Sequence, residues 1–124
     1  MTDASSPVLI VEDSMEDYEA VRQAFTRANL ASPLELLLSG EAALEYLRSD
    51  IKPSPCLILL DLNMPGIGGY KTLETIKKDN ALKEIPVVML SGSNSQTSIK
   101  MCYAMGANGY ITKSADFNIL ATAI

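Results

Sequence analysis

The sequence predicts an α/β fold in which helices cover both faces of a five-stranded parallel sheet. Short apolar runs alternate five times with stretches whose apolar residues recur at helical spacing. Three of the runs, VLIV, CLILL and PVVML, are apolar at every position, as strands covered on both faces must be. The chain has 124 residues, of which 48% are hydrophobic, enough for one domain with its own core. We expect a single domain over residues 1–124, with residues 1–7 as a short flexible tail.

The apolar runs give the strands and their order. The predicted strands are Val8–Val11, Leu34–Leu38, Cys56–Leu60, Pro86–Leu90 and Gly109–Thr112. Glu35 interrupts the second run, so we expect that strand at an edge of the sheet. Right-handed crossovers between five parallel strands favour the flavodoxin-like, doubly wound order 2-1-3-4-5, in which chain order reverses between strands 1 and 3.

Five amphipathic stretches predict five helices. Their apolar faces are Tyr18, Val21, Phe25 and Ala28; Leu44, Leu47 and Ile51; Tyr70, Leu73 and Ile76; Ile99, Cys102 and Tyr103; and Phe117, Leu120 and Ala121. Ser14 and Asp17 have the spacing of a capping box at the start of the first helix, and Ser39 is placed to cap the second. The Pro53–Pro55 turn ends the second helix, and the fourth stops near Gly106.

Polar residues follow the strands at the edge where such sheets bind ligands. Glu12 and Asp13 follow strand 1, and Asp61 follows strand 3 with Asn63 close behind. Ser91 and Gly92 follow strand 4, and Lys113 follows strand 5. Each of these residues taken alone is explained by a helix cap or a solvated loop. Their joint position at the topological switch point favours a functional site.

The acidic residues of this edge favour metal-assisted phosphoryl transfer. Carboxylate oxygens suit a hard divalent cation such as Mg²⁺, and without a counter-charge at least one carboxyl pKa would rise. Lys113 adds a mobile positive charge that fits a carboxylate or a phosphoryl oxygen. The reaction needs positioning and charge neutralisation more than a reactive base, and a carboxylate can serve as nucleophile to form an aspartyl phosphate.

Composition excludes several other functions. The chain contains no histidine, which removes serine and cysteine triads, common zinc sites and a phosphohistidine carrier role. A net charge of −5 argues against nucleic acid or an anionic membrane as a partner. The two cysteines, Cys56 and Cys102, are expected to be reduced thiols in a cytoplasmic protein, and no apolar stretch is long enough to span a membrane.

Four segments together resemble the receiver domain of bacterial two-component response regulators. They are VLIVEDS, LILLDLNMPGIGG, IPVVMLSGS and GANGYITKS, which cover nearly the whole chain. The resemblance implies that Asp61 accepts a phosphoryl group from the phosphohistidine of a sensor histidine kinase. It also implies that Glu12, Asp13, Asp61 and the backbone carbonyl of Asn63 bind Mg²⁺. Such a domain is no enzyme in the usual sense, since it catalyses only its own phosphorylation and dephosphorylation.

The resemblance also assigns a switch. Ser91 matches the hydroxyl that turns toward the phosphoryl group, Lys113 matches the lysine that contacts its oxygens, and Tyr110 matches the aromatic residue that moves inward with Ser91. Tyr110 could equally be a strand tyrosine that is half-packed in the core. Two positions depart from the family pattern: Ser114 replaces a proline, where we expect a cis Lys113–Ser114 bond to be retained, and Gly68–Gly69 replaces an acidic residue and glycine.

The sequence says less about the downstream partner of this domain than about its site. The chain resembles, more weakly, small stand-alone regulators paired with phytochrome-type histidine kinases, although a receiver excised from a longer protein fits equally. We expect a downstream protein partner or phosphotransfer protein to dock on the helix 4–strand 5–helix 5 face, where a homodimer could also form. Three alternatives stay open: an Asp-nucleophile phosphohydrolase of the haloacid-dehalogenase type, an FMN-binding protein, and a degenerate receiver that acts only as a scaffold.

Overall fold

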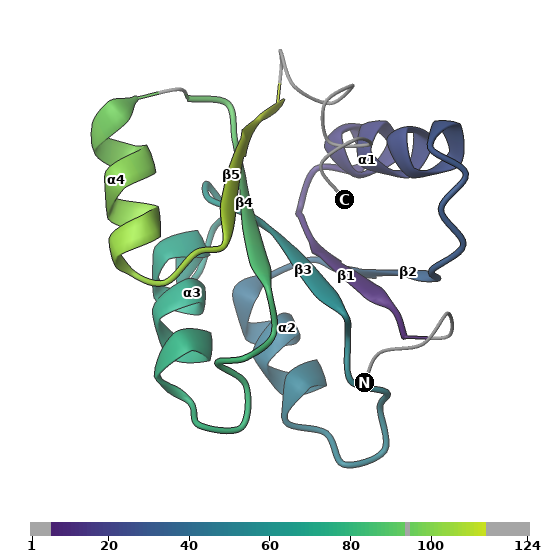
Figure 1. The fold of residues 1–124 in the computed structure, drawn as a ribbon, viewed down its shortest axis with the longest axis horizontal. Coiled ribbons are helices and arrows are strands. Elements are labelled where there is room, and N and C mark those ends of the chain that lie inside the picture. Colours follow the sequence, from purple (N-terminus) through teal and green to yellow (C-terminus); the bar gives the residue numbers. More distant parts are fainter. Residues whose placement is uncertain (1–5, 94, 114–124) are drawn as a thin grey trace.

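The computed structural model describes residues 6–93 and 95–113, which form a parallel sheet between helices (Figure 1). The strands are β1 (Val8–Val11), β2 (Leu34–Leu37), β3 (Leu57–Asp61), β4 (Val87–Ser91) and β5 (Gly109–Thr112). The helices are α1 (Met15–Arg27), α2 (Gly40–Leu47), α3 (Gly68–Lys78) and α4 (Gln96–Ala104). The predicted fifth helix, with Phe117, Leu120 and Ala121, lies outside the described residues, as does the predicted cis bond before Ser114.

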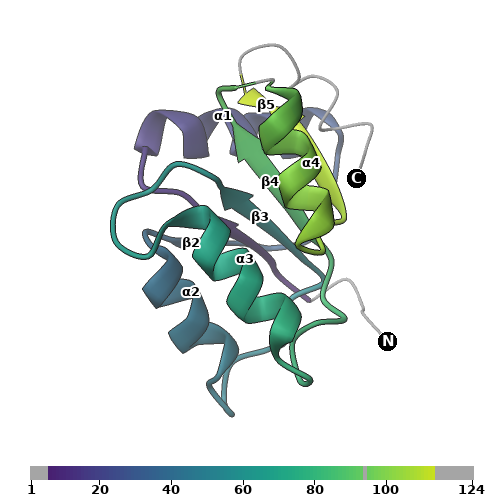
Figure 2. The same ribbon diagram turned by 90° about the vertical axis from the view of Figure 1, so that its left-hand side faces the viewer.

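The sheet has the predicted order, β2-β1-β3-β4-β5, and every pair of neighbouring strands is parallel. The strand with Glu35, β2, lies at an edge as expected. Helices α2, α3 and α4 cover one face of the sheet, and α1 covers the other (Figure 2). The reversal of chain order between β1 and β3 therefore places the ends of these two central strands side by side.

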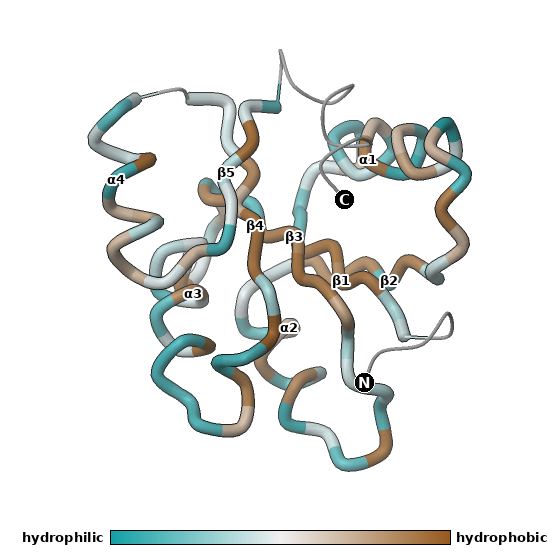
Figure 3. The backbone as a smooth tube through the Cα atoms, in the orientation of Figure 1, coloured by the Kyte–Doolittle hydropathy of each residue, from teal (hydrophilic) through white to brown (hydrophobic). Residues whose placement is uncertain are grey.

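Along the central strands, alternate residues point to opposite faces of the sheet and pack into two separate hydrophobic cores. Leu9, Ile58 and Met89 belong to the cluster packed under α2, α3 and α4. Their neighbours Ile10 and Leu59 belong to the cluster that packs against α1. The three central strands are accordingly the most hydrophobic part of the backbone (Figure 3), and this double burial explains why their sequences show no polar alternation.

Two strands are displaced along the chain from their predicted bounds. Strands β3 and β4 each begin and end one residue later than predicted, so that β3 ends at Asp61 and β4 ends at Ser91. The ladder continues even past Asp61, because the Leu62 amide donates to the Leu90 carbonyl over 2.8 Å. Asp61 and Ser91 are therefore the last residues of rigid strands instead of the first residues of loops, which fixes their positions more firmly.

The predicted extent of two other segments was wrong. Ile51 is not part of the second helix, which ends at Leu47, and its side chain is 90% exposed. The flexible tail was predicted to reach Pro7, but Pro7 is buried and its carbonyl accepts a hydrogen bond from the Cys56 amide at 3.0 Å. That bond extends the pairing of β1 with β3 by one residue toward the N-terminus.

Helix ends follow the predicted caps. Ser14 Oγ accepts from the Asp17 amide, and Ser39 Oγ accepts from the Ala42 amide. The fourth helix stops just before Gly106, whose φ of 105° favours glycine. None of the helices in the described part of the chain is long and apolar enough to cross a membrane.

Candidate metal and phosphoacceptor site

Three carboxylates meet where β1 and β3 end. Glu12 and Asp13 directly follow β1, and Asp61 is the last residue of β3. Glu12 is fully buried and Asp61 is 2% exposed, whereas Asp13 is exposed to solvent. Oxygen atoms of all three carboxylates lie within 4.8 Å of one another. The structure thus brings together the three acidic residues that the sequence predicted to share a site.

Lys113 contacts two of the three carboxylates of this cluster. It follows β5, and its Nζ is 2.8 Å from Glu12 Oε1 and 3.1 Å from Asp61 Oδ1. Its third contact, also 2.8 Å, is with Asp17 Oδ2 of α1. The Lys113 side chain is 14% exposed, so these contacts are only weakly screened by water. Lys113 supplies the counter-charge that this group of carboxylates requires.

Burial and charge shift the ionisation of two groups in the cluster. Burial first, and then the neighbouring Asp61 carboxylate, raise the pKa of Glu12 to about 7. Burial alone would lower the pKa of Lys113, but the contacts with Asp17 and Glu12 and the charge of Asp61 outweigh it and raise that pKa. Lys113 therefore stays protonated, while Glu12 ionises near neutral pH.

The acidic cluster fits a hard divalent cation. Oxygens that bind one Mg²⁺ lie about 2.1 Å from it, so two of them are at most ~4.2 Å apart. The carboxylate oxygens within 4.8 Å of one another need only a small inward shift to reach that spacing. Glu12 Oε1 is buried and, among the described residues, lacks a partner with hydrogen-bond geometry, although Lys113 lies near it. An unsatisfied, buried carboxylate oxygen facing two other carboxylates is a suitable cation ligand.

The loop after β3 is held against the end of that strand. The Asn63 amide donates to Asp61 Oδ1 at 3.2 Å, which places the Asn63 backbone beside the acidic cluster. Gly69 packs directly on the strand end, because a Cβ there would lie 2.5 Å from the Asp61 carbonyl oxygen. Of the Gly68–Gly69 pair, Gly69 therefore has a steric role, whereas Gly68 adopts a φ of 75° in open space.

Ser91 and Tyr110 are connected through Ser93. Ser91 is fully buried, and its Oγ accepts from the Ser93 amide at 3.1 Å. Tyr110 Oη donates to the Ser93 carbonyl at 2.6 Å, and the ring is half-buried beside the α3–α4 core. Within residues 6–93 and 95–113, the Ser91 side chain thus hydrogen-bonds its own loop and not Lys113 or the carboxylates. Ser93 was not singled out from the sequence, since nothing in a serine-rich loop distinguishes it.

Asp17 has a partner that its capping-box position did not predict. A capping box would direct its carboxylate back to the Ser14 amide, but that amide donates to Glu12 Oε2 at 3.2 Å. The Asp17 carboxylate instead contacts Lys113 at 2.8 Å. The position of Asp17 in the sequence could have indicated this contact, because the first turn of the helix after β1 lies at the same edge of the sheet as Glu12.

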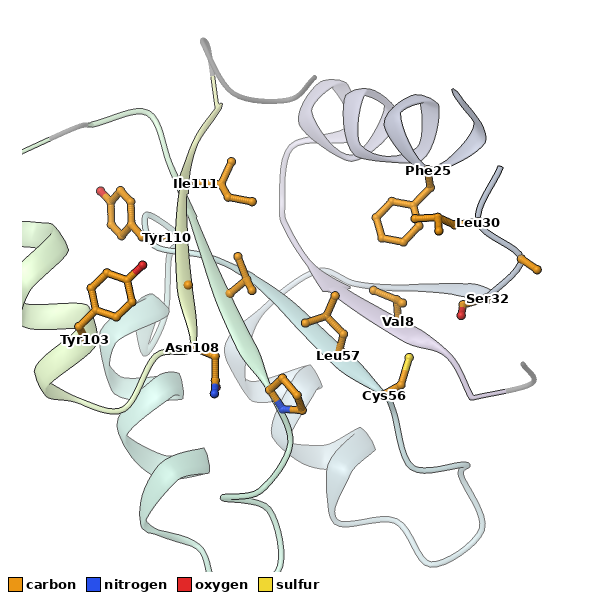
Figure 4. Close-up of a pocket in the computed structure, with 14 residues that line it drawn as sticks. Val8, Phe25, Leu30, Ser32, Cys56, Leu57, Tyr103, Asn108, Tyr110 and Ile111 are labelled. Carbon is orange, nitrogen blue, oxygen red and sulfur yellow. The ribbon is translucent and has the colours of Figure 1, made fainter. Parts of the chain in front are cut away.

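A separate cavity of about 630 Å³ lies on the α1 side of the sheet, away from the acidic cluster. Phe25 of α1 and Val8 of β1 face each other across part of it (Figure 4). None of the three carboxylates, Ser91 or Lys113 lines this cavity. The chemistry expected from the sequence therefore belongs to the polar edge and not to the apolar hollow.

Comparison with known proteins agrees with this geometry. The response regulator receiver domain family matches residues 8–124. Response regulator Rcp1 from Synechocystis sp. is 36% identical over 127 residues, which span 97% of this chain and 86% of that protein.

Solved structures give the same result. The Mn²⁺-bound form of Rcp1 superposes with a TM-score of 0.85 at 34% identity, covering 96% of this chain and 91% of the other. The phosphorylated cyanobacterial phytochrome response regulator RcpA superposes with a TM-score of 0.83 at 35% identity, covering 96% and 88%.

Proposed function

This chain belongs to the response regulator receiver domain family, and from that membership we propose that Asp61 accepts the phosphoryl group that a sensor histidine kinase donates. As a receiver it takes part in two-component signal transduction, in which response regulators are paired with histidine kinases. One observation supports Asp61 above the other acidic residues: its nearly buried carboxylate ends β3, lies 3.1 Å from Lys113 and shares a cluster with the Glu12 and Asp13 carboxylates. We assign the matched residues 8–124, and with them the chain 1–124, to a single receiver domain.

The proposed reaction is a direct displacement at phosphorus. An Asp61 carboxylate oxygen forms a bond to phosphorus as the bond to the kinase imidazole nitrogen breaks, and the electron pair stays on that imidazole. The product is an aspartyl phosphate on this chain and a free histidine on the kinase. No base on this chain is needed, because a carboxylate is already the nucleophile, which is consistent with the absence of histidine.

The chain's own residues neutralise the charge that collects in this reaction. We propose that Glu12, Asp13, Asp61 and the Asn63 backbone carbonyl hold Mg²⁺, which when bound would neutralise phosphoryl charge. Lys113 offers its ammonium protons to the phosphoryl oxygens from the β5 side.

Ser91 and Tyr110 are proposed to report the new charge to the surface. Ser91 Oγ accepts from the Ser93 amide, which leaves the hydroxyl hydrogen free to be donated to a phosphoryl oxygen, and a turn of Ser91 toward that oxygen would move Ser93 with it. Because the Ser93 carbonyl accepts from Tyr110 Oη, a shift of Ser93 reaches β5 and the surface near α4. A downstream protein, a phosphotransfer protein or a second copy of the chain would read the change there.

The kinase is proposed to be of the phytochrome type, in the cytoplasm. The support is the similarity to RcpA, which is described as a phytochrome response regulator. Cys56 and Cys102, both free thiols in the structure, fit a reducing compartment. A haloacid-dehalogenase phosphohydrolase is disfavoured, because its nucleophile follows strand 1 and here Asp61 ends β3. The intact cluster of three carboxylates and Lys113 also disfavours a degenerate scaffold.

Acetyl phosphate with Mg²⁺, followed by intact mass measurement, tests the proposal. We expect the wild type to gain the mass of one phosphoryl group, and to lose most of this gain when Mg²⁺ is chelated. Asp61→Asn should show no gain, because an amide is not a nucleophile toward phosphorus. Asp50→Asn, which changes an exposed aspartate elsewhere, should react like the wild type. Phosphorylation of Asp61→Asn at the wild-type rate would refute the assignment of the acceptor.

A further inference from the structure

Lys113 is held by a carboxylate that is not among the three acidic residues proposed to bind the cation. Asp17 Oδ2 accepts a hydrogen bond from Lys113 Nζ at 2.8 Å, across 96 positions of sequence. The contact joins the first turn of α1 to the residue that follows β5. It is as short as the contact with Glu12 and shorter than the 3.1 Å contact with Asp61.

Carboxylates of Glu12, Asp17 and Asp61 surround the ammonium group, and Asp17 accepts a hydrogen bond from it. Lysine has three N–H donors and no acceptor. Three carboxylate oxygens, from Glu12, Asp17 and Asp61, lie within 3.1 Å of Nζ. If Lys113 is to contact a phosphoryl oxygen on Asp61, as the proposed function requires, one of these contacts must be given up or shared.

Exposure identifies the contact that is given up. Glu12 is fully buried and would lose its counter-charge without gaining water, and Asp61 carries the incoming group. The Asp17 side chain is 34% exposed, so its carboxylate can be rehydrated when the lysine leaves. Its helix also favours a free carboxylate, because the first turn of a helix stabilises negative charge.

We propose that Asp17 is a positioning residue that shares Lys113 with Glu12 and Asp61 in the resting protein and gives up its contact when the lysine turns to the phosphoryl group. This proposal rests on the function assigned above. Asp17 thereby stabilises the unphosphorylated form selectively, because its contact with the lysine is exchanged for a contact with the phosphoryl oxygen. Removing the charge of Asp17 should favour the phosphorylated form.

The test is a double-mutant cycle between Asp17 and Lys113. Beryllofluoride with Mg²⁺ serves as a phosphoryl mimic, with binding followed by fluorine NMR, and acetyl phosphate labelling is followed by intact mass. We expect Asp17→Asn to bind beryllofluoride about three- to tenfold more tightly than the wild type, and to label faster, as the loss of one partly exposed charged contact predicts. In a Lys113→Met background the same substitution should change neither quantity.

Two further variants separate positioning from general charge. Glu16→Gln removes one charge from the same helical turn at an exposed position and should match the wild type. Asp17→Glu restores the carboxylate and should return binding toward the wild-type value. Thermal unfolding of each variant reports that the fold is intact.

The opposite result has a clear form. Weaker beryllofluoride binding by Asp17→Asn, or an equal increase in the Lys113→Met background, would overturn the role of Asp17. Equal binding by the wild type and Asp17→Asn would overturn it as well, while leaving the function intact. Failure of the wild type itself to take either phosphoryl reagent would instead remove the proposed function on which this role depends.

Discussion

Glu12 has an environment that sets how the acidic edge responds to pH. Its side chain is fully buried, one oxygen accepts from the Ser14 amide, and the other lies 2.8 Å from Lys113. Burial and the adjacent Asp61 carboxylate raise its pKa to about 7. A proton and a divalent cation therefore compete for the same carboxylate near neutral pH.

Divalent cation affinity should consequently rise with pH between about 6 and 8. A carboxyl group with a raised pKa holds its proton to higher pH, and the cation requires the deprotonated form, so acid weakens binding. Below pH 7 the affinity should fall by up to about tenfold for each pH unit, which calorimetric titration with Mg²⁺ measures. Glu12→Gln should bind more weakly and lose this pH step. A wild-type affinity that stays flat from pH 6 to 8 would contradict the assignment of Glu12 as a ligand.

The sequence predicts which side chains meet at this edge only where the position of a residue at the end of a strand determines its place. Glu12, Asp13, Asp61 and Lys113 converge because parallel strands end at one edge, and that rule needs no side-chain geometry. Asp17 was assigned only a capping role, because its true partner is 96 residues away and the orientation of a helical carboxylate is set by tertiary contacts. Ser93 escaped notice for a related reason: its part in linking Ser91 to Tyr110 is played by its backbone.

At the scale of elements, α3 is seated on the end of β3 by a single glycine. A Cβ at Gly69 would lie 2.5 Å from the Asp61 carbonyl oxygen and 2.6 Å from Leu62 Cα, and both of these atoms belong to backbone. The Gly69 amide also donates to the Leu62 carbonyl at 3.2 Å. The helix thus approaches the acceptor strand more closely than any residue with a side chain allows.

Gly69→Ala should destabilise the fold and displace the acceptor together. The added methyl group must push α3 and the Asp61–Leu62 backbone apart, which should cost about 1–3 kcal/mol in the free energy of unfolding measured by urea titration. Acetyl phosphate labelling should slow in the protein that remains folded. Gly68→Asn is the matched control, because Gly68 has a φ of 75°, which Asn tolerates, and open space around its Cβ position. A Gly69→Ala protein as stable as the wild type would contradict this steric role and show that the Asp61–Leu62 backbone shifts at little cost.

The elements themselves were predictable where local chemistry determines them. Apolar runs located all five strands, and Ser14 and Ser39 marked the helix starts, since each signal is contained within a few residues. Predictions failed where neighbouring strands decide the outcome. The ladder beyond Asp61 depends on the Leu90 carbonyl of β4, and the burial of Pro7 depends on Cys56 before β3. The end of α2 at Leu47 also depends on tertiary packing, because the spacing of apolar residues alone predicts a helix that continues to Ile51.

Over the whole molecule, part of the excess negative charge lies where a cation would act. The net charge is −5, and three carboxylates share one edge of the sheet with Lys113 as the ammonium in contact with two of them. Those carboxylates follow β1 or end β3, two of the three central strands, and both strands contribute residues to both cores. A ligand bound there stabilises the folded chain as a unit, since the unfolded chain does not assemble the site.

Mg²⁺ should therefore raise the melting temperature, and Asp13 should decide how much. At a free concentration ten times the dissociation constant, linkage predicts ~1.4 kcal/mol of added stability, or roughly 4–7 °C for a chain of this size. Asp13 is exposed, so Asp13→Ala should leave the metal-free melting temperature within about 2 °C of the wild type while abolishing most of the Mg²⁺-dependent rise. Differential scanning calorimetry with and without Mg²⁺ compares the two proteins directly. An equal Mg²⁺-dependent rise in both would mean that the cation binds without Asp13, and the three-carboxylate site would have to be redrawn.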